Sequence, residues 1–292
     1  MGSYHPECPA RLDAIHDRLI SSGLDAHLQH YEAPEATDEQ LARVHGQDYL
    51  EMIAESSPAS GVHYLDPDTA LNPYSESAAR HAAGAVVLAT DLVMRAECDT
   101  AFCAVRPPGH HAERNRAMGF CIYNSLAVGV AHALAEHDLE RAAIVDFDVH
   151  HGNGTEDIFS DDPRVIMVGS FQHPLYPYSG FENVAENMHN VPLSAGTDGE
   201  VMRRAVTDVW LPALNAFRPQ ILFISAGFDA HREDPLANLK WSDADYTWVT
   251  QQLTAVAGEH CDGRIVSSLE GGYALSALGR SATLHVRALA GL

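Results

Sequence analysis

The sequence predicts an α/β fold with a central parallel sheet covered by helices. Short apolar runs alternate with helix-like segments along the 292 residues, and this alternation is typical of βα units. Four of the runs end in clusters of polar side chains, and ligands of parallel sheets bind outside the carboxyl ends of the strands. Apolar residues make up 46% of the chain, and no repeat or low-complexity linker interrupts it. We therefore expect residues 1–292 to form a single domain.

We expect the regular structure of the N-terminal half to be mostly helical. Leu12, Ile15 and Leu19 form an apolar stripe in the first of them, and Thr37 with Gln40 can form a capping box for the second. Prolines and glycines mark a loop between the second and third helices. The expected elements are a helix at 9–22, a short helix near 37–44, a loop at 51–75, a helix at 76–95, a strand at 100–105 and a helix at 124–136.

The C-terminal half alternates more regularly between apolar runs and helical segments. Ser242 and Asp245 can form a capping box, and Pro212 is expected to break the helix that contains it. The expected strands lie at 142–145, 165–168, 221–224 and 264–268, and the expected helices at 199–217, at 243–259 and at the end of the chain.

A cluster of carboxylates and histidines follows the strand at 142–145. Alternate side chains of an extended chain share a face, so Asp146, Asp148 and His150 are expected to point the same way. Oxygen and imidazole ligands at this spacing suit a divalent transition metal, while a solvated acidic loop is the alternative. Asp229 follows another strand and completes a three-ligand set. Three protein ligands leave a position open for water and substrate, as in catalytic metal sites.

Further polar residues at the same edge suggest the chemistry. Two carboxylate ligands nearly neutralise a divalent ion, so a separate general base is needed, and His110 or His111 can supply it. Asp146 and Asn153 are available to fix the histidine tautomers. Tyr273 follows two glycines and can donate a hydrogen bond to a developing oxyanion. Jointly these residues predict metal-assisted hydrolysis of an amide or ester.

Composition excludes several classes of partner and location. The net charge is −22 and no Lys/Arg cluster occurs, so we expect neither nucleic acid nor an anionic membrane as partner, whereas cationic substrates would be attracted. No signal peptide or membrane-length apolar run is visible. An odd number of cysteines without Cys-x-x-Cys spacing favours free thiols in a reducing cytoplasm. These cysteines are Cys8, Cys98, Cys103, Cys121 and Cys261.

These motifs together resemble the histone deacetylase superfamily, on its class II or bacterial histone deacetylase-like amidohydrolase side. They occur in family order over nearly the whole chain. The resemblance implies the three-layer α/β/α arginase/deacetylase-like fold and a zinc hydrolase that removes acetyl or related acyl groups from the ε-amine of lysine. The matching stretches are His5-Pro6-Glu7-Cys8-Pro9-Ala10-Arg11, Arg106-Pro107-Pro108-Gly109-His110-His111, Gly119-Phe120-Cys121, 146–155 (DFDVHHGNGT), 225–230 (SAGFDA) and Leu269-Glu270-Gly271-Gly272-Tyr273.

The resemblance also implies a role for each matching residue. A metal-bound water would attack the amide, with zinc or ferrous iron as the metal. A structural potassium ion would bind Asp146 together with the backbone oxygens of Asp148 and His150. The implied roles are zinc ligation by Asp148, His150 and Asp229, base and acid catalysis by His110 and His111 with His111 as the base, support of His110 by Asp146 and of His111 by Asn153, and polarisation of the acyl carbonyl by Tyr273.

Resemblance at the substrate tunnel is partial. Gly119 and Phe120 would line one wall, and Tyr176 stands where the family usually has Phe on the other. Leu236 replaces the gatekeeper Glu of polyamine-selective relatives, which favours acyl-lysine substrates. Arg11 resembles an arginine near an internal acetate-release channel. The family usually has a strand and loop before the His5 motif, so we expect a short or truncated form here.

Two other functions remain as alternatives. The first keeps the chemistry and changes the substrate to an acetylpolyamine or another small acylated amine. The second is a non-catalytic module that binds acyl-lysine or metal. Such a module would need neither Tyr273 nor the histidine pair, so their presence favours an enzyme.

Overall fold

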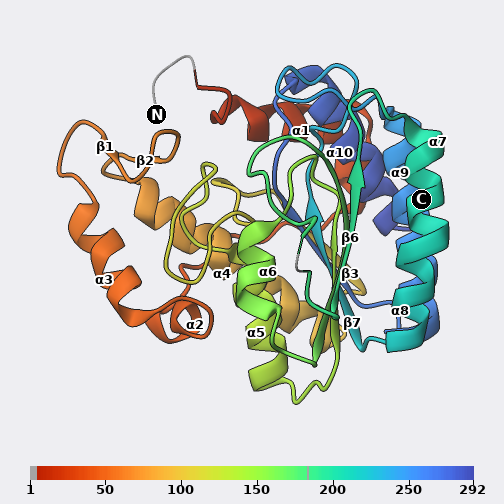
Figure 1. The fold of residues 1–292 in the computed structure, drawn as a ribbon, viewed down its shortest axis with the longest axis horizontal. Helices are drawn as coiled ribbons and strands as arrows, with labels where there is room; N and C mark the ends of the chain where they lie inside the picture. The colour runs from red at the N-terminus through yellow and green to blue at the C-terminus, as the bar shows by residue number, and fades with distance from the viewer. Residues whose placement is uncertain (1–4, 183) are drawn as a thin grey trace.

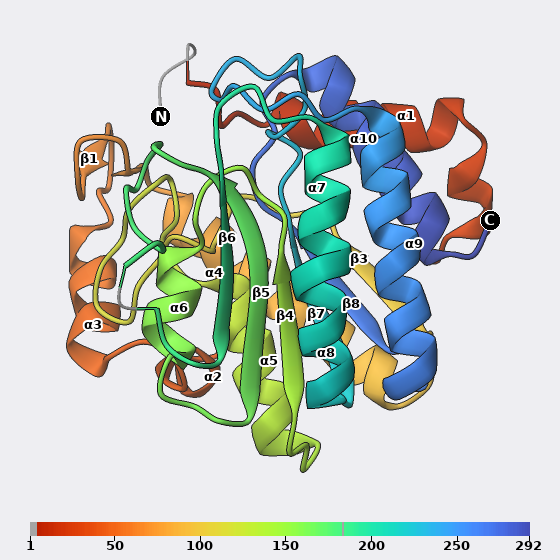
Figure 2. The same cartoon turned by 45° about the vertical axis from the view of Figure 1, so that its right-hand side comes forward.

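The central layer is a six-stranded parallel sheet, seen in a computed structural model that describes residues 5–182 and 184–292. Residues 1–4, which precede the His5 motif, and residue 183 lie outside the described residues. Strand order is β3-β8-β7-β4-β5-β6, and every pairing is parallel (Figure 2). The strands are β3 (Thr100–Cys103), β4 (Ala142–Asp146), β5 (Val165–Gln172), β6 (Met188–Leu193), β7 (Ile221–Ala226) and β8 (Ile265–Leu269).

Helices cover both faces of the sheet, which confirms the predicted three-layer α/β/α fold (Figure 1). One layer contains α2 (Asp38–Ala42), α3 (Gln47–Ser56), α4 (Ser75–Met94), α5 (Ser125–Glu136) and α6 (Asn153–Phe159). The other contains α1 (Ala10–Ser21), α7 (Gly199–Ala205), the π-helical turn η2 (Val206–Trp210), α8 (Leu211–Phe217), α9 (Asp243–His260) and α10 (Leu275–Leu289). A short 3₁₀ helix, η1 (Leu24–His27), follows α1.

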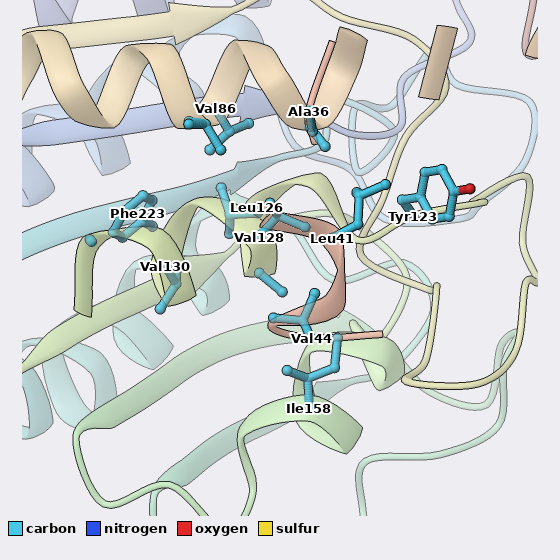
Figure 3. Packing of buried hydrophobic residues seen from close by; sticks show 14 of the residues in the cluster. Ala36, Leu41, Val44, Val86, Tyr123, Leu126, Val128, Val130, Ile158 and Phe223 are labelled. Carbon is cyan, nitrogen blue, oxygen red and sulfur yellow. The ribbon is translucent and has the colours of Figure 1, made fainter. Parts of the chain in front are cut away.

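Successive residues of the central strand belong to different cores. Ile144 packs into the core under α4 and α5, where Val86 and Phe223 also lie (Figure 3). Val145 packs into the core on the opposite face with residues such as Trp210. A strand buried on both faces needs a continuous apolar run rather than an alternating one, and the sequence of β4 provides it.

The connections that leave β4 and β7 diverge. The two strands are neighbours in the sheet, but β4 continues into α6 on one face and β7 continues toward α9 on the other. Such a switch point leaves a crevice at the carboxyl ends of the two strands, because neither connection covers it. The predicted metal ligands follow these two strands.

Three local predictions were wrong. The stretch 51–75 is not all loop: α3 extends to Ser56, and a hairpin joins β1 (His63–Tyr64) to β2 (Ala70–Leu71). The helix at 199–217 is not broken at Pro212, because the preceding turn widens into π-helical η2 and the helical path continues. Edge strand β6 was missed because its residues include His189, Asn190 and Pro192, and proline is tolerated only at such an edge.

The five cysteines carry free thiols, as expected. Burial raises the pKa of Cys103 and of Cys261 to about 12, so both thiols are poor nucleophiles. Within the described ranges, no helix is both long and apolar enough to cross a lipid bilayer.

Two buried histidines should make the fold sensitive to acid. Burial lowers the pKa of His45 to about 4 and that of His285 to about 3. Both are held neutral: His45 Nε2 accepts from Asn124 N at 2.9 Å, and His285 lies 2.9 Å from Ser267 Oγ. The unfolded chain binds a proton at pH values where these folded histidines do not, so stability falls as the pH falls below their ordinary pKa.

We therefore predict that the free energy of unfolding decreases between about pH 6.5 and pH 4, with each histidine contributing at most about 1.4 kcal/mol per pH unit. Urea unfolding at a series of pH values measures this slope. His285→Asn should reduce the slope, whereas His30→Asn, at a largely exposed side chain, should not. An unchanged slope in His285→Asn would refute the assignment.

Candidate active site

Three potential metal ligands meet at the switch point of the sheet. Asp148 and His150 follow β4 and Asp229 follows β7, and their ligand atoms all lie within 4.8 Å of one another. His150 Nδ1 is 2.9 Å from Asp148 Oδ1 and 3.2 Å from Asp229 Oδ2. Asp229 Oδ2 is buried and accepts no hydrogen bond from any described residue. A buried carboxylate oxygen without a donor is what a cation site provides.

The turn after β4 directs these ligands inward. The side-chain alternation of the strand continues past its end, so Phe147 and Val149 pack into the core while Asp148 and His150 face the site. Asp148 N donates to Asp146 Oδ1 at 3.0 Å, which tightens the turn. The expectation that Asp146, Asp148 and His150 share a side therefore agrees with the structure, although the strand itself ends at Asp146.

The electrostatics of this group favour a cation. Burial, together with repulsion from Asp148, raises the pKa of Asp229 to about 6. Burial alone would lower the pKa of His150, but the adjacent carboxylates of Asp148 and Asp229 raise it to about 10. Two carboxylate oxygens and one imidazole nitrogen form a donor set that suits zinc or ferrous iron. A bound divalent ion would neutralise the two carboxylates in place of the imidazole proton.

Glycine backbone lies directly against the carboxylates. A Cβ on Gly271 would fall 2.0 Å from Asp229 Oδ2, and one on Gly227 would fall 2.1 Å from Asp148 Oδ2. Gly271 N also donates to Asp148 Oδ2 at 2.8 Å. The glycines therefore allow the backbone to approach the ligands closely, and one of them orients a ligand oxygen.

The tandem histidines lie beside the metal ligands with different partners. His110 Nδ1 is 2.9 Å from Asp146 Oδ2, and His111 Nδ1 is 2.8 Å from Asn153 Oδ1. Although burial opposes it, Asp146 and nearby Asp148 hold the pKa of His110 well above its ordinary value. Burial, with the neighbouring His110 and His150, holds the pKa of His111 well below its ordinary value. One imidazole is thus cationic and its neighbour neutral.

Tyr273 is held at the site by contacts to its backbone and ring. Asp234 Oδ2 accepts from Tyr273 N at 2.7 Å. The guanidinium carbon of Arg11 lies 4.9 Å from the centre of the Tyr273 ring, and Arg11 Nε donates to Gly272 O at 2.7 Å. Arg11 is fully buried and also donates to Glu270 O. Burial raises the pKa of Tyr273 well above its ordinary value, so the phenol keeps its proton and can act as a donor.

Two aromatic rings border the site. Phe120 contacts Tyr273 edge to face at 6.0 Å, and Tyr176 contacts His111 in the same way at 5.3 Å. Gly119 lies under the imidazole of His111, because a Cβ there would be 2.4 Å from His111 Cδ2. Leu236 N donates to Asp234 Oδ1 at 3.1 Å, and 36% of the leucine is exposed. Phe120, Tyr176 and Gly119 thus contact Tyr273 or His111 directly, whereas Leu236 is linked to Tyr273 only through Asp234.

The hydroxyl of a buried serine in β5, the strand next to β4, lacks a hydrogen-bond partner in the described part of the chain. Asp146 pairs with Gly169 of β5, and the following residue, Ser170, has a buried hydroxyl that finds no partner in the described part of the chain. A buried oxygen without a protein partner, in the strand that pairs with β4, is one that a bound cation or an ordered water could satisfy.

Sequence reasoning assigned no role to three acidic residues that organise the site. Glu270 Oε2 accepts from Gly109 N at 2.6 Å and from His110 N at 3.0 Å, and so fixes the loop of the histidine pair. Asp234 fixes the backbone of Tyr273, and Glu113 accepts from Asn153 Nδ2 at 2.8 Å. Glu270 could have been found, because a strand end directly before two glycines is an unusual place for a buried acid.

A second group with metal-ligand geometry lies away from this edge. Asp91 on α4, His132 on α5 and His137 also have ligand atoms within 4.8 Å of one another. Arg43 donates to His132 Nδ1, so His132 Nε2 carries the proton and donates to Asp91 Oδ1 at 2.9 Å. His137 Nε2 lies 2.8 Å from the same oxygen. These hydrogen bonds satisfy the group without an ion.

Comparison with known proteins identifies relatives along the whole chain. The model of the histone deacetylase domain matches residues 5–289. A histone deacetylase-like amidohydrolase from Pseudomonas aeruginosa is 39% identical over 276 residues, which span 92% of this chain and 72% of that protein. A probable deacetylase from Archaeoglobus fulgidus is 36% identical over 93% of this chain and 77% of its own length. The crystal structure of the HDA15 HD domain covers 100% of this chain and 85% of its own, with a TM-score of 0.93 and 35% identity.

The close approach of Gly271 to the ligands gives a test of the metal site. Gly271→Ala should displace Asp229 and weaken zinc binding by about 10- to 100-fold, the range for disrupted support of a metal ligand. Competition with a chromophoric chelator measures the affinity. Gly258→Ala is the matched control, because a Cβ on this α9 glycine meets nothing within 4 Å. Wild-type zinc affinity in Gly271→Ala would contradict the assigned ligands.

Proposed function

The chain belongs to the histone deacetylase family, whose members hydrolyse amides, and from this premise we propose that it is a zinc-dependent deacylase. Its proposed substrate is the ε-acetyl or related acyl group of lysine in proteins or peptides. One observation carries the proposal: three clustered ligands, one with an unpaired carboxylate oxygen, lie beside a histidine pair and a protonated phenol. We propose a single deacetylase domain acting in the cytoplasm.

Asp148, His150 and Asp229 would hold the zinc, with ferrous iron as the alternative ion. When bound, the metal would polarise the acyl carbonyl and acidify a water molecule. A structural potassium ion is proposed near Asp146, with the backbone oxygens of Asp148 and His150, and the unpaired hydroxyl of Ser170 supports this position.

His111 is the proposed general base. Its Nδ1 proton is donated to Asn153 Oδ1, which leaves Nε2 free to accept a proton from the attacking water. Its low pKa keeps the ring neutral and ready for this role. The cationic His110, paired with Asp146, would stabilise developing negative charge while His111 holds the proton. The proton gained by His111 would then pass to the leaving amine.

Tyr273 would donate its phenolic hydrogen to the oxygen of the tetrahedral intermediate. Asp234 accepts from the backbone of Tyr273 and Arg11 packs on its ring, and together they hold it in place. Phe120 and Tyr176 would flank the methylene groups of the acylated lysine, with Gly119 completing the wall beside His111. Arg11 is also proposed to border the route by which acetate leaves.

We favour acyl-lysine over acetylpolyamine as the proposed substrate because of the residue at position 236. Leu236 is apolar and partly exposed, so it offers no carboxylate to a second ammonium group of a polyamine. The net charge of −22 attracts cationic substrates of both kinds and does not discriminate between them.

Loss of the phenolic hydroxyl should impair catalysis with little effect on folding or metal content. We predict that Tyr273→Phe lowers kcat by about 100- to 1000-fold, as expected for loss of one oxyanion donor. Steady-state deacylation of an acetyl-lysine peptide by zinc-loaded protein measures this. Tyr178→Phe, at a tyrosine that is 68% exposed, is the matched control. Equal activities of the two variants would exclude Tyr273 as the donor.

Substrate choice is tested at position 236. We predict that wild type has a higher kcat/KM for an acetyl-lysine peptide than for an acetylated polyamine. We also predict that Leu236→Glu shifts the ratio toward the polyamine by about two- to fivefold, the worth of one exposed ion pair. Leu236→Gln, which adds the same size without the charge, should leave the ratio near wild type. A wild-type preference for the polyamine would overturn the substrate assignment and leave the reaction class intact.

A further inference from the structure

Asn153 lies between His111 and Glu113. The two ends of its side-chain amide differ, because the oxygen only accepts hydrogen bonds and the nitrogen only donates them. We propose that Glu113 is a positioning residue that fixes the orientation of this amide and thereby the tautomer of His111. The inference rests on the proposed function, in which His111 is the general base. Glu113 does not touch the metal ligands or the reacting atoms, and it acts through Asn153 alone.

The contacts around Asn153 define one orientation of the amide. Its Oδ1 lies 2.8 Å from His111 Nδ1, and its Nδ2 lies 2.8 Å from Glu113 Oε1. Two weaker acceptors face the same nitrogen: Met118 Sδ at 3.3 Å and His111 O at 3.4 Å. An ionised carboxylate can only accept, so the end of the amide that faces Glu113 must be the nitrogen. Among the three acceptors, Glu113 is the closest and the charged one.

This orientation determines where the proton of neutral His111 resides. An oxygen at 2.8 Å requires Nδ1 to be the donor, so the proton is on Nδ1 and the lone pair is on Nε2. The reversed amide would direct an N–H group at Nδ1 and would force the proton onto Nε2. A base that must accept a proton at Nε2 would then be blocked. The Asn153–Glu113 contact therefore selects the competent form of His111.

An asparagine in this position needs such a partner, whereas an aspartate would not. Both oxygens of an aspartate accept, so its orientation is immaterial to His111. The same aspartate would, however, place a second carboxylate next to that of Glu113, at the 2.8 Å separation now spanned by an N–H···O bond. Like charges at this distance repel strongly. The pair is matched: an acid at position 153 would introduce repulsion, and loss of the acceptor at position 113 would release the amide.

The backbone holds Glu113 in register with Asn153. Glu113 N donates to Arg116 O at 2.9 Å, and Glu113 O lies 3.1 Å from His45 Nδ1. The carboxylate lines a cavity of about 430 Å³ that is also bordered by Asp157 and Asp161. Solvent in this polar cavity can reach the Glu113 side chain while one of its carboxylate oxygens accepts from Asn153.

A double-mutant cycle tests the inference on zinc-loaded full-length protein. Glu113→Ala should lower kcat on an acetyl-lysine peptide by about 10- to 100-fold, in keeping with loss of one charge-assisted hydrogen bond, with KM nearly unchanged. Asn153→Asp should also lower kcat, because it adds a repelling carboxylate. The double variant Glu113→Ala/Asn153→Asp should be more active than either single variant, since the remaining carboxylate accepts from His111 whatever its orientation.

Two single variants serve as controls. Glu113→Gln keeps an acceptor oxygen without the charge, so its kcat should stay within about threefold of wild type. Asp161→Ala removes a carboxylate from the same cavity without touching Asn153, and it should behave as wild type. Equal losses in Glu113→Ala and Asp161→Ala, or a double variant no better than Glu113→Ala, would overturn the inference.

A spectroscopic measurement separates this inference from the proposed function. Long-range ¹H–¹⁵N correlation spectra distinguish the two neutral tautomers, and the His111 signals are identified by their loss in His111→Gln. Wild type should show the proton on Nδ1, and Glu113→Ala should populate the Nε2–H form. A wild type that deacylates no peptide would refute the proposed function, and the spectra would still decide the role of Glu113. An unchanged Nδ1–H form in Glu113→Ala would refute that role.

Discussion

The buried carboxylates at the carboxyl edge of the sheet set the main constraint on this structure. Ionised groups removed from water must be paired, hydrogen bonded or bound to a cation. Backbone amides serve several of them: Gly271 donates to Asp148, and Tyr273 donates to Asp234. Asp229 Oδ2 is left without a donor within the described chain, and it faces His150 and Asp148. This is the arrangement that we propose a divalent cation completes, in place of further protein groups.

The topology of the sheet explains why these charges can be gathered at one point. Because β4 and β7 are neighbours whose connections leave on opposite faces, their ends are uncovered and short turns suffice to bring Asp148, His150 and Asp229 together. The loop carrying His110 and His111 is tied to this point by Glu270. Tyr273 follows Glu270 by three residues along the chain. Backbone geometry thus links the proposed metal ligands, the proposed base and the proposed oxyanion donor.

Local sequence patterns predicted the elements that dominate this geometry, and tertiary contacts account for most of what they did not predict. The apolar run of β4 predicted the strand, and the polar residues after it predicted a cluster of ligand candidates that the structure brings together. Edge strand β6 carries polar residues and a proline, so its pattern does not resemble that of a buried strand. The contact between Glu113 and Asn153 spans 40 residues and depends on which end of an amide faces a carboxylate, and no local pattern encodes that choice.

The central claim is that the buried ligands at the β4–β7 junction hold the catalytic metal, and anomalous diffraction tests it most directly. Crystals grown with zinc would be measured on both sides of the zinc absorption edge. The account predicts one strong anomalous peak bounded by Asp148, His150 and Asp229. The Asp91, His132 and His137 group, whose hydrogen bonds are already satisfied, should show none. A peak at that second group with none at the junction would contradict the account.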